Sequence, residues 1–178
     1  MNGFTRPLIL LLGDSLIDYG EWHLRLPDYR VISRGVPGER TEELLRRLPV
    51  QPQVEAPDAL VLMSGTNNIV FGDFGFIDAT RQILIKLRKR FVGVPILVTS
   101  LLPYRIPGIA STIQEANRQL RRLCDKSGSI YLDVCRHFEN SPDRLFDYDG
   151  VHLSNGGYRI WASVLDEYLR NLLAKAPD

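Results

Sequence analysis

A serine, an aspartate and a histidine occur in this chain in an order that suits nucleophilic catalysis. Ser15 follows Gly-Asp after the aliphatic run 8–12, and Asp149 precedes His152 by three residues near the end of the chain. A serine hydroxyl attacks a carbonyl carbon efficiently when a neighbouring imidazole accepts its proton. That imidazole needs a carboxylate on its other nitrogen, which Asp149 supplies if both side chains face the same way. Together these residues predict acyl transfer through an acyl-serine.

Attack on an ester carbonyl also places negative charge on oxygen, and positioned hydrogen-bond donors stabilise that charge. The backbone N–H of Ser15 is one candidate donor. Gly35 lacks a side chain, so its backbone can approach a substrate closely, and Asn67 offers a side-chain amide. We therefore expect an oxyanion hole formed by Ser15, Gly35 and Asn67. This scheme requires no metal and no cofactor.

Hydrophobic patterning indicates which elements position these residues. Continuous apolar or β-branched runs are typical of strands buried on both faces of a parallel sheet. Such runs occur at 8–12, 30–33, 59–63, 94–100 and 129–134. Segments with helical spacing of apolar residues lie at 41–48, 78–91, 111–126 and 155–174. In the last helix, we expect Ile160, Val164, Tyr168 and Leu172 to form one apolar stripe.

Strands that alternate with helices require crossover connections, which produce a mainly parallel sheet with helices on both faces. We predict one domain over residues 1–178, a three-layer α/β/α sandwich with a five-stranded sheet. Open α/β sheets bind their ligands at the carboxyl ends of the strands. The segments that carry the candidate residues should meet there, with the aromatic residues Tyr19 and Trp22 at the rim of the crevice.

Composition narrows the class of partner. The chain has 22 Lys and Arg against 21 Asp and Glu, a formal net charge of +1. This balance favours neither nucleic acid nor an anionic membrane surface, so we expect a small-molecule ester as the partner. Cys124 and Cys135 are too few for a disulfide scaffold, and no apolar run approaches the ~20 residues that span a bilayer. We expect a soluble cytoplasmic protein with free thiols.

Four sequence blocks resemble those of the SGNH hydrolases, the superfamily of GDSL-type esterases and lipases. They are GDSL at 13–16, RGVPGERT at 34–41, GTNN at 65–68 and DGVHLS at 149–154. The resemblance implies a flavodoxin-like fold with strand order 2-1-3-4-5. It also implies Ser15 as nucleophile, Asp149 and His152 as its partners, and Gly35 and Asn67 with the Ser15 N–H as the oxyanion hole.

The third block ends in Asn68, where many members of the superfamily have aspartate, so its supporting hydrogen bonds need a different arrangement. The RGV and GTNN forms are closest to small members similar to the catalytic subunits of platelet-activating-factor acetylhydrolase. Two alternatives to a hydrolase stay open. An alcohol can intercept an acyl-enzyme and make the protein an acyltransferase. The same fold can also serve as a catalytically silent ligand-binding module.

Overall fold

The computed structural model describes residues 6–48, 55–139, 141 and 144–174 and contains the predicted sheet. All strand pairs are parallel and the strand order is β2-β1-β3-β4-β5. The strands are β1 (Leu8–Gly13), β2 (Arg30–Gly35), β3 (Ala59–Met63), β4 (Ile96–Thr99) and β5 (Ile130–Leu132). Every residue of β1, β3 and β4 is buried, which explains their continuous apolar sequence. The predicted fold class and strand order are confirmed.

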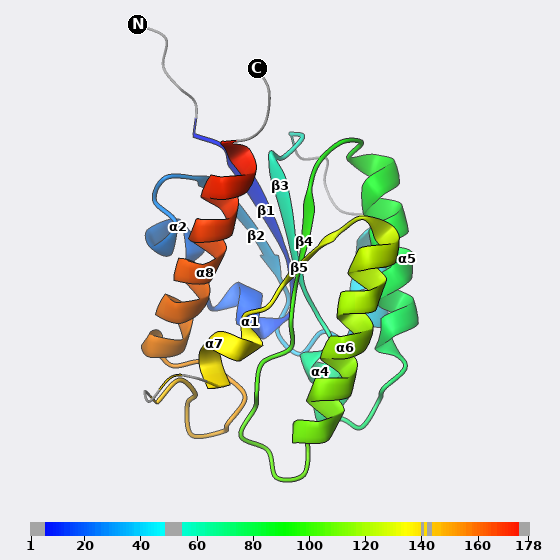
Figure 1. Ribbon diagram of the computed structural model, residues 1–178, viewed down its shortest axis with the longest axis vertical. Coiled ribbons are helices and arrows are strands. Elements are labelled where there is room, and N and C mark those ends of the chain that lie inside the picture. The colour runs from blue at the N-terminus through cyan, green and yellow to red at the C-terminus, as the bar shows by residue number, and fades with distance from the viewer. Residues whose placement is uncertain (1–5, 49–54, 140, 142–143, 175–178) are drawn as a thin grey trace, which may run out of the picture.

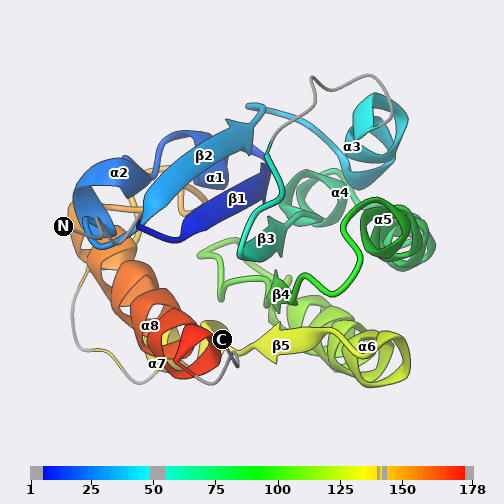
Figure 2. The same ribbon diagram turned by 90° about the horizontal axis from the view of Figure 1, so that it is seen from above.

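Helices cover both faces of the sheet. The four predicted helices are α3 (Thr41–Arg47), α5 (Phe76–Arg90), α6 (Ala110–Ser127) and α8 (Asn155–Leu173). Four short ones were not predicted: α1 (Ser15–Asp18), α2 (Trp22–Arg25), α4 (Thr66–Val70) and α7 (Cys135–Glu139). Helix α8 lies on one face, and α5 and α6 lie on the other (Figure 2). Helices α1 and α4 follow the carboxyl ends of β1 and β3 (Figure 1).

The apolar stripe predicted for the last helix is wrong in part. Of its four residues only Val164 is buried, whereas Ile160 and Leu172 are half-buried and Tyr168 is 37% exposed. Residues four apart drift by about 40° around a helix with 3.6 residues per turn, so a strict four-residue spacing leaves the core face. The buried residues of α8 alternate shorter and longer spacings: Gly157, Tyr158, Trp161, Ala162, Val164, Leu165 and Leu169.

The chain passes from β1 into α1 within one residue, at Asp14. A Cβ atom on Gly13 would collide with the Met63 carbonyl oxygen, so only glycine fits at the end of this strand. The Asp14 carboxylate then caps α1 by accepting the Leu16 N–H at 3.0 Å. Asp14 is fully buried, and this burial raises its pKa from the usual 3.8 to about 6, with nearby Glu39 adding to the rise.

This raised pKa predicts a pH-dependent stability difference between the wild type and Asp14→Asn. The folded state holds the Asp14 proton up to about pH 6 whereas the unfolded chain releases it near 3.8, so the contribution is present at pH 4 and lost above pH 6. The asparagine oxygen keeps the cap and does not titrate. Denaturant unfolding of both proteins from pH 4 to 8 should show the wild type losing roughly 2–2.5 kcal/mol relative to the variant. A difference that is constant across this range would contradict the account.

Candidate active site

The candidate nucleophile and base lie in direct contact although 137 residues separate them in sequence. Ser15 is the first residue of α1, and its Oγ lies 3.0 Å from Nε2 of His152. The serine is 6% exposed, whereas the histidine side chain is 37% exposed. The hydroxyl therefore lies at the base of a site whose imidazole reaches solvent.

Two aromatic side chains hold α1 in place. The Tyr158 hydroxyl of α8 donates to the Leu16 carbonyl at 3.2 Å, and the Trp22 indole N–H donates to the Ile17 carbonyl at 2.7 Å. Trp22 also packs edge to face on Trp161, with ring centroids 4.9 Å apart, and it is 2% exposed. The prediction that Trp22 lies at the rim of the crevice is therefore wrong. Its indole lies in the core and binds α1 through the Ile17 carbonyl.

Asp149 holds the other side of the imidazole. Its Oδ2 lies 2.5 Å from Nδ1 of His152, and its Oδ1 accepts the backbone N–H groups of Val151 and His152, each at 2.9 Å. These bonds, above all the one to the imidazole, lower the pKa of Asp149 to about 2. The aspartate thus stays ionised at neutral pH and can stabilise a protonated imidazole.

Backbone contacts hold the segment that carries these two residues. Phe146 and Leu153 form an antiparallel bridge, which closes the segment into a loop just before α8. The Gly150 carbonyl accepts the Arg105 N–H at 2.8 Å. Gly150 has a φ of 74°, in the left-handed region that favours glycine. The loop geometry follows from main-chain bonds and from one glycine.

Asn67 lies in the first turn of α4, at the end of the neighbouring strand β3. Its Nδ2 donates to the Glu39 carbonyl at 2.9 Å. An amide nitrogen carries two protons, so one remains for a substrate oxygen. No sequence pattern indicated that Glu39 would contact Asn67. Every residue has a backbone carbonyl, so a contact made by that group cannot be recognised from the amino-acid sequence.

The asparagine at position 68 suits its surroundings. The Asn68 Oδ1 accepts the Thr41 N–H at 3.0 Å, and its Nδ2 donates to carboxylate oxygens of Glu42 and Asp73 at 2.9 and 2.8 Å. An aspartate here would face these two carboxylates without a proton to share. The departure from the common motif therefore matches Glu42 and Asp73, and it joins α4 to α3.

Gly35 lies at the end of β2, directly against α1. A Cβ atom there would meet the Asp14 carbonyl oxygen and the Asp18 backbone, so close packing explains why the residue is glycine. In the ladder, the Val36 N–H donates to the Gly13 carbonyl, which directs the Gly35 N–H away from β1. Its role as an oxyanion donor stays a prediction.

Two other backbone N–H groups lie near the site, those of Ser15 and Gly38. Among the described residues, no hydrogen bond engages the N–H of Ser15 or of Gly38. Gly38 lies in the turn after β2 with a φ of 76° and open space beside its α-carbon. Either group can donate to a bound oxygen.

A cavity of about 290 Å³ adjoins the imidazole of His152. The Tyr19 ring forms part of its wall and lies 5.6 Å from the His152 ring, and this tyrosine is 51% exposed. The remaining lining is largely polar: Glu21, Arg25, Asp147, Leu153, Asn155 and Tyr158. The space beside the proposed base is therefore wide enough for a small group with hydrogen-bonding atoms.

Across the described residues there is no cluster of three or more His, Cys, Asp or Glu side chains placed to hold a metal ion. In the same part of the chain, no helix has the length and apolar character needed to cross a bilayer.

Known proteins resemble this chain in both sequence and fold. Rat platelet-activating factor acetylhydrolase IB subunit alpha2 is 24% identical over 97% of this chain and 80% of that protein. A putative platelet activating factor from Streptococcus pneumonia has a TM-score of 0.82, with 22% identity over 94% of this chain and 86% of that one. An acetylxylan esterase from Geobacillus stearothermophilus, solved as a catalytic mutant, has a TM-score of 0.75, with 17% identity over 97% and 96% of the two chains.

The family profile of GDSL-like lipases and acylhydrolases matches residues 11–160, a span that contains Ser15, Asn67, Asp149 and His152. This match covers most of the chain and agrees with the strand order and the four blocks described above. The chain belongs to the GDSL-like lipase/acylhydrolase family, whose members are ester hydrolases of the SGNH type.

Proposed function

We propose that this enzyme hydrolyses carboxylic esters of short acyl groups through an acyl-serine intermediate on Ser15. The observation that carries the proposal is the unbroken hydrogen-bond chain from the Ser15 hydroxyl through the His152 imidazole to the Asp149 carboxylate, at 3.0 and 2.5 Å. Membership of the acylhydrolase family supports it.

In this mechanism His152 accepts the Ser15 proton as Oγ forms a bond to the ester carbonyl carbon. The tetrahedral intermediate collapses when the imidazolium returns that proton to the departing alkoxide, which leaves an acyl-serine. In the second half, His152 accepts a proton from a water molecule as that water attacks the acyl carbonyl carbon. The imidazolium then returns the proton to Ser15 Oγ, and the carboxylic acid departs. Asp149 fixes the imidazole tautomer and stabilises its charge, which suits a carboxylate with a pKa of about 2.

The oxyanion of each tetrahedral intermediate accepts hydrogen bonds from the Ser15 N–H and from the free proton of the Asn67 amide. A third donor comes either from Gly35 at the end of β2, as the motif implies, or from Gly38 in the turn after it, whose N–H has no partner among the described residues. A crystal structure of the enzyme with a phosphonate on Ser15 separates them, because the donor must lie within about 3 Å of the phosphonyl oxygen.

The leaving alcohol occupies the polar cavity beside His152, because the imidazole that protonates the alkoxide must lie within reach of that oxygen. Glu21, Arg25 and Asn155 offer hydrogen bonds to a hydroxylated alcohol there. An acetylxylan esterase among the structural neighbours acts on an ester of this kind, which agrees with a polar alcohol portion.

Asp149→Asn tests the proposed triad. An asparagine at this position can hold the wrong imidazole tautomer, so kcat for p-nitrophenyl acetate should fall by about 10³–10⁴-fold, and Ser15→Ala should fall at least as far. Asp78→Asn is the control, since Asp78 is an exposed carboxylate on α5 that pairs with Arg81. Retention of wild-type kcat by Asp149→Asn, with the fold intact by circular dichroism, would contradict the triad.

Asn67→Ala tests the oxyanion donor. Loss of one donor should lower kcat by roughly 10²–10³-fold and leave KM nearly unchanged, because the bond strengthens only as charge develops on the oxygen. Asn67→Asp should be at least as slow, since it keeps the shape and replaces the N–H by a negative charge. A large rise in KM at unchanged kcat would mean instead that Asn67 only binds the ground state.

A series of p-nitrophenyl esters from acetate to dodecanoate tests the acyl preference. Phe71 and Phe74, in the segment after α4, are 65% and 57% exposed and do not close an apolar tunnel. A methylene that stays in water gains none of the ~0.8 kcal/mol that burial provides. We expect kcat/KM to fall or stay level as the acyl chain lengthens. Steady improvement beyond octanoate would show that a long acyl site exists.

A further inference from the structure

An ion pair between a buried glutamate and a partly buried arginine lies beside the candidate active site and takes no part in the triad. Nε and Nη2 of Arg47, at the end of α3, donate to the two carboxylate oxygens of Glu39 at 2.5 and 2.7 Å. The side chains are 21% and 6% exposed, respectively. A two-point pairing of this kind fixes the orientation of both side chains, because the planar guanidinium matches the carboxylate.

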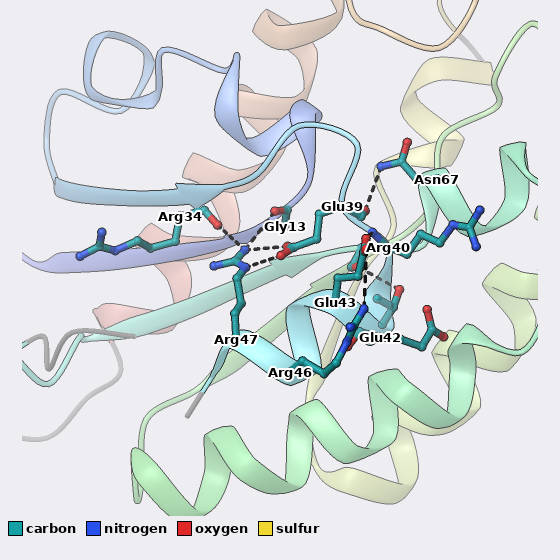
Figure 3. Close-up of polar contacts among 11 residues, drawn as sticks. Gly13, Arg34, Glu39, Arg40, Glu42, Glu43, Arg46, Arg47 and Asn67 are labelled. Carbon is teal, nitrogen blue, oxygen red and sulfur yellow. Dashed lines mark hydrogen bonds and ion pairs between the residues drawn. The ribbon is translucent and has the colours of Figure 1, made fainter. Parts of the chain in front are cut away.

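The same guanidinium also binds the ends of two strands. Its Nη2 donates to the Arg34 carbonyl at 2.8 Å and lies 3.4 Å from the Gly13 carbonyl oxygen. Arg34 is next to the last residue of β2, and Gly13 ends β1 two residues before Ser15. Arg47 therefore joins the segment that carries Glu39 to the strand ends beside the nucleophile, as Figure 3 shows.

Glu39 in turn contacts the proposed oxyanion donor. Its backbone carbonyl accepts the Asn67 Nδ2 at 2.9 Å (Figure 3). A carbonyl can only accept, so this bond determines which end of the amide is nitrogen and where its second proton points. A shift of the Glu39 backbone would redirect that proton.

We propose that Glu39 and Arg47 are positioning residues, a clamp that aims the Asn67 amide at the oxyanion. The inference rests on the proposed esterase function. Removing two charges from water costs free energy, so the ion pair contributes little to stability on balance. A fixed orientation of the Asn67 amide is therefore a reason for the pair to be present. Lysine cannot replace the arginine in this role, because its ammonium lacks the planar fork that binds a carboxylate and two carbonyls together.

A second ion pair on helix α3 offers a matched control. Glu43 and Arg46 form another ion pair, at 3.6 Å, but their side chains are 48% and 75% exposed. Glu43 also accepts the Arg40 N–H through Oε2, a bond that the oxygen of a glutamine can keep. In Figure 3 this pair lies beside the helix, apart from the bonds that join Arg47 to Gly13 and Arg34.

The experiment compares Glu39→Gln and Arg47→Lys with the controls Glu43→Gln and Arg46→Lys. With p-nitrophenyl acetate as substrate, the two clamp variants should lower kcat roughly 10- to 100-fold with KM within about two-fold of the wild type. The controls should keep wild-type kcat. Thermal unfolding and circular dichroism identify a temperature at which every variant is folded, and kcat is measured there. Because the two clamp variants differ in chemistry, the test still holds if one of them misfolds.

A double-mutant cycle with Asn67→Ala separates positioning from general support of the fold. If the clamp acts through the Asn67 amide, Glu39→Gln should cause little further loss of kcat once that amide is absent. An equal loss in both backgrounds, or wild-type kcat in both clamp variants, would overturn the proposal. A wild-type enzyme that does not hydrolyse the ester would instead overturn the proposed function, so the two failures are distinguishable.

Discussion

The turn from β1 into α1 is the constraint on which the rest of the site depends. Gly13 has no room for a side chain against the Met63 carbonyl, and Asp14 caps the helix from a fully buried position. Ser15 therefore falls in the first turn of α1, where a backbone N–H has no partner within the helix. In the proposed mechanism, this one turn supplies both the hydroxyl that attacks and a donor for the charge that the attack creates. The cost is a buried carboxyl group whose pKa is raised to about 6.

The other parts of the site reach this turn by different physical means. His152 and Asp149 lie on a half-exposed loop, and main-chain bonds and their mutual hydrogen bond hold them in place. Asn67 depends instead on the backbone of Glu39. The proposed acid–base pair can therefore exchange protons with solvent, while the proposed oxyanion donors lie against the packed ends of the strands. An exposed imidazole suits a reaction in which water must enter for the second step. Donors held by packed strand ends suit it too, because movement of the donors would weaken their stabilisation of the oxyanion.

Much of the fold could be predicted because buried parallel strands leave a continuous aliphatic signature, as in 59–63. Helices of four or five residues such as α1 and α4 are too short to show a period, so they were missed. The contact between Ser15 and His152 could be inferred from the order of the motifs, and its geometry agrees with that inference. The Glu39 and Arg47 pair could not, because helix α3 shows an ordinary arrangement of acids early and bases late. In that pattern a partly buried arginine looks the same as an exposed one.

The proposed mechanism depends above all on Ser15 being an activated nucleophile. The most direct measurement is labelling of the folded protein with a fluorophosphonate probe, followed by peptide mapping by mass spectrometry. The probe reacts with a serine hydroxyl only where a base removes its proton, so a single modified residue is expected at Ser15, with labelling slowed in His152→Ala. Labelling of another serine at a comparable rate, or no labelling of the folded protein, would contradict the account.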